Sequence, residues 1–274
     1  MGNNTVKNQH YIPRFYQKFW ECEYKGVVWS LDKELGTIRR QAIKTNCCMP
    51  YTYEADNEHP DNAFEGWYGK FESKYCLKYN RLIDSRKCLN RVSDEDKRLI
   101  CLMYAHFSAR DPHNVYYDTK NHAVAAHFTL GIDNAIVDRK NILNIMALGE
   151  SGTLDEESSE FAKELRGMKV RLLFFGKNTI FFPDHLIKSI KSGEEYFFPM
   201  CPDCVAHFSA SEMAADGMVR KMSEEEYNRF ENLYYTHPYV DRVFSSDRET
   251  LERIKDRYIT ISIKAPGLQN NQGG

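Results

Sequence analysis

The sequence lacks the long apolar run that a membrane-spanning helix needs. No stretch approaches the roughly 20 consecutive apolar residues that cross a bilayer. The first residues, from Met1 to Thr5, also lack the apolar core of a secretory signal peptide. We therefore expect a protein that has no membrane segment and that is located in the cytoplasm.

Charge of one sign is not in excess either. The chain has 37 Lys and Arg residues against 39 Asp and Glu residues, which gives a formal net charge of -2. A chain with this balance has no global field that would draw it to nucleic acid or to anionic lipid. Any site for a phosphate group must therefore be formed by a few residues that the fold brings together.

Disulfides are not expected, although the sequence contains eight cysteines. The cysteines are scattered and no export signal precedes them, which favours reduced thiols that are mostly buried. Cys201-Pro202-Asp203-Cys204 with His207 has the spacing of zinc knuckles and of redox pairs. A second cysteine pair at a standard distance is missing, because Cys47 and Cys48 are adjacent. We therefore predict that a strand ends at this motif and that Pro202 and Asp203 form a turn. Zinc binding is the alternative.

The composition is that of an ordinary globular protein, with 42% hydrophobic and 28% charged residues. The 17 Tyr and 16 Phe residues are assigned to core packing. We predict one α+β domain over residues 1–266 and a disordered tail over 267–274. Its helical part, 1–166, makes the N-terminal two-thirds helical apart from a small β-hairpin. Its β-rich part, 167–266, is predicted to be a mostly antiparallel sheet with flanking helices.

Apolar periodicity places the elements of the first part. Residues 27–43 predict a β-hairpin with a polar turn between its strands. Residues 63–85 predict a helix, because apolar residues recur there at spacings of three and four. Ser93, three residues before Asp96, begins a second and largely apolar helix that ends near Arg110. Further helices are expected over 120–148 and 156–166.

The second part favours strands, because β-branched and aromatic residues cluster there in short runs. The alternation over 259–263 predicts a closing strand. A capping pattern at Ser223 begins one helix, and another is predicted over 246–256. Turn residues separate the remaining runs, which predict strands at 170–175, 179–182 and 196–198.

The N-terminal segment carries a family signature. Asn8-Gln9-His10-Tyr11-Ile12-Pro13-Arg14-Phe15-Tyr16, followed by Phe19, resembles the start of the domain of unknown function 4238 family. The likeness continues through Phe64-Glu65 and Phe71-Glu72, which are similar to its paired glutamates, and through 105–112, where the family carries an Arg near a Pro. Phe181-Phe182-Pro183-Asp184-His185 stands in place of a later element and shares its Asp. The resemblance implies a mixed helix and strand fold with a shared polar site, and it assigns no reaction.

Six ionisable residues lie beside apolar segments, where an unpaired charge would be costly. We expect them to face one another, and they are the candidate catalytic residues: His10, Arg14, Glu65, Glu72, Arg110 and Asp184. In the functional interpretation the histidine is a base or a ligand, the carboxylates hold it or a metal, and the arginines bind an anionic group. In the structural interpretation the same charges only satisfy one another. His106, four residues before Arg110, is a secondary candidate on the same helix face.

This combination of residue types suits phosphodiester or phosphoryl chemistry. Arginine would offset negative charge, and histidine or a carboxylate-bound Mg²⁺ would activate the nucleophile. The first hypothesis is a nuclease or nucleotide-processing enzyme of a toxin or phage-defence type, with nucleic acid or a nucleotide as its partner. The alternative is a non-enzymatic binding module whose polar cluster is structural.

Overall fold

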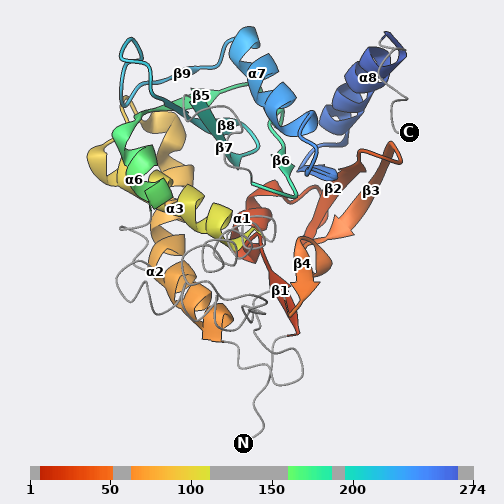
Figure 1. Cartoon of the computed structure of the whole chain (residues 1–274), viewed down its shortest axis with the longest axis horizontal. Helices are drawn as coiled ribbons and strands as arrows, with labels where there is room; N and C mark the ends of the chain where they lie inside the picture. The colour runs from red at the N-terminus through yellow and green to blue at the C-terminus, as the bar shows by residue number, and fades with distance from the viewer. Residues whose placement is uncertain (1–6, 52–62, 112–159, 187–194, 265–274) are drawn as a thin grey trace, which may run out of the picture.

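The computed structural model of the chain describes residues 7–51, 63–111, 160–186 and 195–264 (Figure 1). Within these ranges the fold is α+β, with a two-stranded ribbon, two four-stranded sheets and helices packed around them. The helices predicted over 120–148 and the tail predicted over 267–274 lie outside the described residues.

The N-terminal part of the chain is built mostly of strands. The prediction that the N-terminal two-thirds of the chain are helical is therefore wrong. Up to residue 51 the described helices are single turns of three or four residues. Pro13 precedes the first of them, and turns at Gly26 and Gly36, both with positive φ, lead back into strands. The elements are β1 (Asn8–His10), α1 (Arg14–Gln17), η1 (Lys18–Trp20), β2 (Val27–Asp32), β3 (Thr37–Ala42), η2 (Ile43–Thr45) and β4 (Cys48–Pro50).

Long helices occur in the middle of the chain and towards its C-terminus. The helices predicted over 63–85 and from Ser93 are confirmed, and the Ser93 hydroxyl accepts the backbone N–H of Asp96 at 3.1 Å. At the other predicted cap, Ser223 and Glu226 form a complete capping box. The elements are α2 (Ala63–Ser85), η3 (Arg86–Cys88), α3 (Asp94–Arg110), α6 (Glu160–Gly167), α7 (Glu224–Tyr235) and α8 (Arg248–Lys264).

The closing strand predicted over 259–263 is wrong, because these residues continue α8. The helix begins where the Asp247 carboxylate accepts the backbone N–H of Thr250 at 3.0 Å. From there to Lys264 the sequence has neither Gly nor Pro, so each added residue extends the helix by one hydrogen bond. Five alternating residues are too short a pattern to outweigh that local continuity.

The first four-stranded sheet joins the two ends of the chain. Its order is β3-β2-β10-β6, and the hairpin predicted over 27–43 supplies β2 and β3. Strand β10 pairs antiparallel with both β2 and β6. The partners that complete the sheet are β6 (Phe182–Pro183) and β10 (Arg242–Ser245), of which β6 overlaps the predicted strand 179–182 only at Phe182.

The second sheet has the order β7-β8-β5-β9 and is antiparallel except for the parallel pair of β5 and β9. The predicted strand at 196–198 is confirmed as part of β7, and the one at 170–175 is confirmed in β5 except for Phe175, which follows the strand. Neither β8 nor β9 was predicted. The bounds are β5 (Lys169–Phe174), β7 (Glu195–Cys201), β8 (Cys204–Ser209) and β9 (Val219–Lys221).

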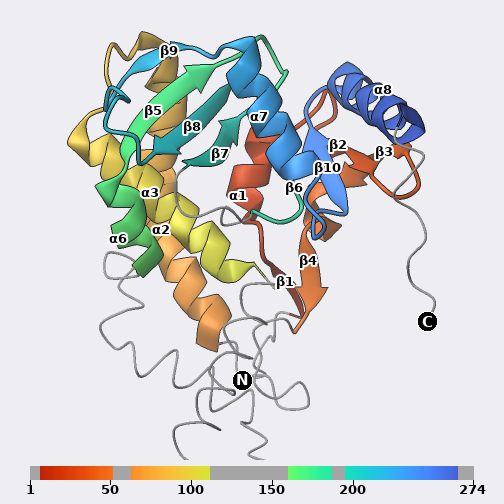
Figure 2. The ribbon, with the colours of Figure 1, turned by 45° about the horizontal axis from the view of Figure 1, so that its top comes forward.

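Helices cover both faces of this second sheet, with α2, α3 and α6 on one side and α7 on the other (Figures 1 and 2). Neighbouring residues of β7 point to opposite faces, as in any strand. Phe198 stacks on Tyr104 of α3 with ring centroids 5.1 Å apart, whereas Phe197 packs against Phe230 of α7 at 6.1 Å. The aromatic residues therefore form the core, as the sequence predicts.

Tyr16 of α1 lies where the two sheets and α3 meet. Its side chain is fully buried and contacts Phe107 of α3, Phe182 of β6 and Phe198 of β7, with centroids 5.0 to 6.0 Å apart. Its hydroxyl donates to the carbonyl oxygen of Pro199 at 2.5 Å. This residue of the N-terminal signature is therefore part of the core.

Replacing Tyr16 with Phe should destabilise the protein by about 1 to 3 kcal/mol, because the buried carbonyl of Pro199 loses its donor while the ring stays in place. Urea unfolding measures the change. Tyr24→Phe is the matched control, since Tyr24 is 46% exposed and should change stability by less than about 0.5 kcal/mol. Equal losses in the two variants would contradict the assignment.

Candidate functional site

Arg110, the last residue of α3, is a buried cation. It is 1% exposed, and residues of α2 and β1 surround its guanidinium. One terminal nitrogen pairs with the Glu72 carboxylate, and the other donates to the backbone carbonyl of His10 and lies 3.6 Å from the Glu65 carboxylate. The guanidinium also sits over the ring of Tyr68, 4.4 Å from its centroid. We call Arg110, Glu65, Tyr68, Glu72 and His10 the Arg110 cluster.

Helix α2 presents three of these residues because of their spacing. Glu65, Tyr68 and Glu72 are three and four residues apart, so they follow one another along a single flank of the helix. The two carboxylates are about a quarter exposed, while the cation between them is buried. The flank of α2 that carries both glutamates is the flank that meets the end of α3.

His10 joins this cluster through its backbone, and its ring points to a different partner. The ring Nε2 is 3.3 Å from the carbonyl oxygen of Ile43. Burial lowers the pKa of His10, the Ile43 carbonyl opposes that effect, and the charges of Arg14 and Arg110 lower the pKa further. The imidazole is therefore neutral at pH 7, and a ring that donates from Nε2 carries its lone pair on Nδ1.

Arg14 begins α1 and is exposed, four residues after His10. It acts on His10 through its charge and forms no ion pair within the described residues. Arg14 therefore lies beside the cluster, and the structure does not place its guanidinium on either glutamate.

Asp184 has a different role from the other five candidates. Its carboxylate accepts the backbone N–H groups of Asp241 at 3.2 Å and Arg242 at 3.0 Å, and the Arg242 guanidinium lies 3.6 Å away. Asp184 therefore fastens the end of β6 to the start of β10. Of the six candidates, the structure brings together the side chains of Glu65, Glu72 and Arg110 with the backbone carbonyl of His10, whereas Arg14 lies nearby and Asp184 belongs to a neighbouring set.

That neighbouring set contains a buried ion pair that sequence reasoning missed. His185 Nδ1 lies 3.0 Å from the Asp111 carboxylate, and the His185 ring stacks on Tyr11 with centroids 5.6 Å apart. We call Asp111, His185, Tyr11, Asp184 and Arg242 the His185 cluster. Both partners of the ion pair stand inside segments that the sequence singles out, but they are 74 residues apart and no local pattern indicates that they meet.

Electrostatics inside the His185 cluster favour bound protons. Burial raises the pKa of Asp184 to about 6, although His185 and Arg242 lower it. Burial alone would lower the pKa of His185, but the hydrogen bond and charge of Asp111, together with the charges of Asp184 and Asp241, raise it above the ordinary value. The folded state therefore holds protons here more tightly than the unfolded chain does.

The secondary candidate His106 is a core residue. It is 3% exposed, stacks on Phe71 with centroids 3.8 Å apart and meets Tyr68 edge-on at 5.4 Å. Burial lowers the pKa of His106 far below its usual range, and the charge of Arg110 adds to this. His106 is therefore a neutral imidazole that packs against Phe71 and Tyr68, and Tyr68 in turn contacts Arg110.

A metal-binding set is not assembled in the described residues: no three His, Cys, Asp or Glu side chains there are placed to hold one ion. Cys201 and Cys204 are paired across the β7–β8 hairpin, and the predicted turn at Pro202 and Asp203 is confirmed. The His207 ring bonds Glu195 at 2.5 Å and Arg171 at 2.7 Å instead of facing the cysteines.

All eight cysteines are free thiols, and half of them are buried: Cys47, Cys101, Cys201 and Cys204.

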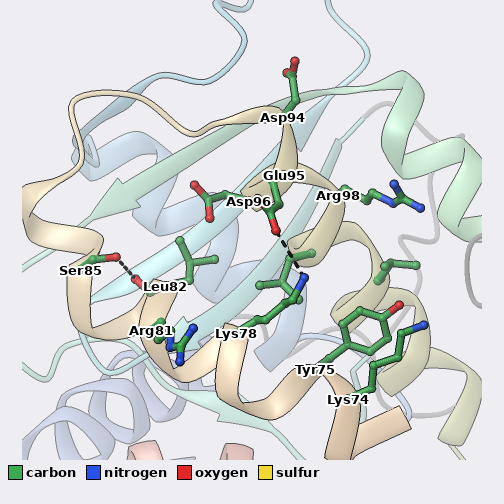
Figure 3. A pocket seen from close by; sticks show the side chains of 12 residues that line it. Lys74, Tyr75, Lys78, Arg81, Leu82, Ser85, Asp94, Glu95, Asp96 and Arg98 are labelled. Atoms are coloured by element: carbon green, nitrogen blue, oxygen red, sulfur yellow. Dashed lines mark hydrogen bonds and ion pairs between the residues drawn. The ribbon is translucent and has the colours of Figure 1, made fainter.

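A groove of about 820 Å³ lies between α2 and α3 (Figure 3). Both signs of charge line it, because cations from α2 face acidic residues at the start of α3. Lys78 reaches across to Glu95 at 3.3 Å, as the dashed line in Figure 3 shows. The basic row on the exposed face of α2, which sequence reasoning missed, is detectable as lysines and an arginine four, four and three residues apart: Lys70, Lys74, Lys78 and Arg81.

Residues 8–165, more than half of the chain, match the family described as Protein of unknown function (DUF4238). This chain belongs to the DUF4238 family. The matched range contains the whole Arg110 cluster, whereas Asp184, His185 and Arg242 lie beyond it. Neither a curated protein nor a solved structure matches the chain. In the described part of this DUF4238 protein, no helix has the length and apolar character to cross a membrane.

Replacing Asp184 with Asn tests the proton binding of the His185 cluster. The folded pKa of about 6 lies above the ordinary 3.8, so the contribution of Asp184 to stability is complete below about pH 4 and is lost as the pH rises through about 6. At about 1.4 kcal/mol per pKa unit, the stability of the wild type minus that of Asp184→Asn should fall by about 3 kcal/mol between about pH 4 and pH 7. Urea unfolding at each pH measures this difference, and a flat or rising difference would contradict the assignment.

Proposed function

We propose that this protein is a non-enzymatic binding module in which the Arg110 cluster is structural. The burial of the Arg110 guanidinium carries this proposal. At 1% exposure, with Glu72, Glu65, the His10 carbonyl and the Tyr68 ring around it, the cation is enclosed by its own chain. A group in that state neutralises its neighbours and is not presented to a substrate.

The arrangement supports a fastening role for the cluster. Strand β1 has three residues and, among the described strands, pairs only with β4, which also has three. Isolated strand pairs of this length are not stable in water. The bond from Arg110 to the His10 carbonyl links β1 to α3 across 100 residues of sequence, and the glutamates link both to α2. The cluster thereby holds the N-terminal segment on the two central helices.

Removal of the cation should therefore destabilise the fold strongly. Arg110→Ala leaves two carboxylates and a carbonyl without their partner, and we expect a loss of about 3 to 5 kcal/mol in urea unfolding. Glu72→Gln, which leaves Glu65 in place, should cost less. Lys78→Ala is the control, because its ion pair with Glu95 is more than half exposed and should contribute at most about 1 kcal/mol. If Arg110→Ala unfolds like the control, the structural role is wrong.

One observation favours a second candidate, the nuclease or nucleotide-processing enzyme. The ring of His10 is half-buried and neutral, and its Nε2 is directed at the Ile43 carbonyl, while Arg14 and Arg110 lie close enough to affect its pKa. A base needs such an oriented neutral imidazole, and a phosphate needs nearby cations. In this candidate His10 would be the base, with Arg14 as the cation beside it and Mg²⁺ as the metal.

Expression of the wild type beside His10→Ala separates the two candidates. For a binding module, cellular RNA and DNA should be equally intact in both cultures, and purified wild type with Mg²⁺ should leave RNA and plasmid DNA uncut. His10→Asn is the control for folding, because its amide keeps a donor for the Ile43 carbonyl. Degradation by the wild type that is lost in both variants, at unchanged stability, would replace the binding module with the enzyme.

A further inference from the structure

A pocket of about 490 Å³ opens at one edge of the second sheet. The parallel strands β5 and β9 end there side by side, with Phe174 opposite Lys221. The β7–β8 turn reaches the same edge, because Phe174 is also opposite Cys204. The residues that line the pocket come from these strand ends, from η3 and from the turn after β5: Lys87, Phe174, Gly176, Lys177, Asp203, Val219, Arg220 and Lys221.

Cations outnumber carboxylates around this pocket. The Asp203 carboxylate forms ion pairs with both Arg86 and Lys87, at 2.7 Å each. Arg220 forms a bidentate ion pair with the nearly buried Glu226. Lys177 and Lys221 are exposed, and neither is ion-paired with a carboxylate of the described residues. Two lysines in excess thus face the same volume, in a chain whose net charge is -2.

The pocket also has an apolar wall. Phe174 and Val219 line it and are only partly covered by the core beneath them. The remaining wall is a tight turn in which Gly176 has φ +51, and a Cβ added at Gly176 would lie 2.7 Å from Thr179 Cγ2. The absence of a side chain at Gly176 lets the turn close, and the next residue, Lys177, is exposed and lines the pocket.

We propose that this pocket binds a phosphorylated small molecule that carries a flat ring, such as a nucleoside diphosphate. Lys177 and Lys221 neutralise the phosphates, with Lys87 beside them, and the ring packs against Phe174 and Val219. A volume of this size fits a ligand of that class, and a few cations on a partly apolar lining are the usual composition of such sites.

This inference gives the binding module a ligand class and rests on residues outside the Arg110 cluster. Lys87 follows the C-terminal end of α2, whereas Glu72 lies thirteen residues before that end, about 20 Å along the helix. The α2–α3 groove is a weaker candidate for an anion, because Asp94, Glu95 and Asp96 line it as well. Four cations and three carboxylates line that groove, whereas four cations and one carboxylate line the pocket at the sheet edge.

Isothermal titration calorimetry of the full chain with ADP, inorganic pyrophosphate and adenosine tests the proposal. Wild type should bind ADP most tightly, pyrophosphate more weakly and adenosine least, and added salt should weaken ADP binding. The double variant Lys177→Glu/Lys221→Glu should bind ADP about tenfold more weakly or worse. Lys25→Glu, an exposed lysine in the loop before β2, is the single charge-reversal control and should bind like the wild type.

Three results would overturn the proposal: no binding of ADP or pyrophosphate to the wild type, equal binding of adenosine and ADP, or ADP binding unchanged in the double variant. Both lysines are exposed, so the double variant should melt like the wild type, and the melting curve shows whether a loss of binding is local. A failure here leaves the Arg110→Ala result unaffected, and a failure of that result does not alter the ADP titration.

Discussion

A guanidinium that is 1% exposed must be neutralised inside the protein, and this requirement connects segments that are distant in sequence. Taking an ion out of water costs several kcal/mol unless its partners are well placed. The end of α3 can therefore be buried only where α2 presents Glu65 and Glu72 and where β1 presents a carbonyl. Tyr68 adds an aromatic face to the same cation. The position of the N-terminal segment follows from the position of one charge.

The residues that follow His10 and Arg110 in the chain extend this polar network to the His185 cluster. His10 directs its carbonyl to Arg110, and the next residue, Tyr11, stacks on His185. Likewise, Arg110 faces the glutamates while Asp111 pairs with His185. Consecutive residues thus serve two clusters. Asp184 then carries the connection to β10 through two backbone N–H groups, so the N-terminal segment and the C-terminal strands share one buried polar system.

The sequence predicts well those features that depend on a long periodic pattern or on residues close together in the chain. Glu65 and Glu72 lie in a helix long enough for periodicity to show which flank they share, and Ser93 marks the start of the helix that ends at Arg110. Strands of two to four residues, such as β1, β4, β6, β9 and β10, carry too little pattern and form because a partner strand is present. The contact of Asp111 with His185 could not be predicted for the same reason, because no local pattern connects two residues that only the tertiary fold brings together.

Within α2, charge is sorted by flank. Glu65 and Glu72 lie on one side of the buried aromatic stripe, and the basic row from Lys70 to Arg81 lies on the other. The carboxylates are thus available to Arg110, and the cations stay at the surface. At its C-terminal end the helix is tied to the β7–β8 turn, because Asp203 holds both Arg86 and Lys87. One helix therefore fixes both the Arg110 cluster and the wall of the basic pocket. Loss of Arg110 should cost more stability than loss of Lys87, because the Arg110 guanidinium is buried, whereas Lys87 is mostly exposed and its ion pair contributes about 1 kcal/mol or less.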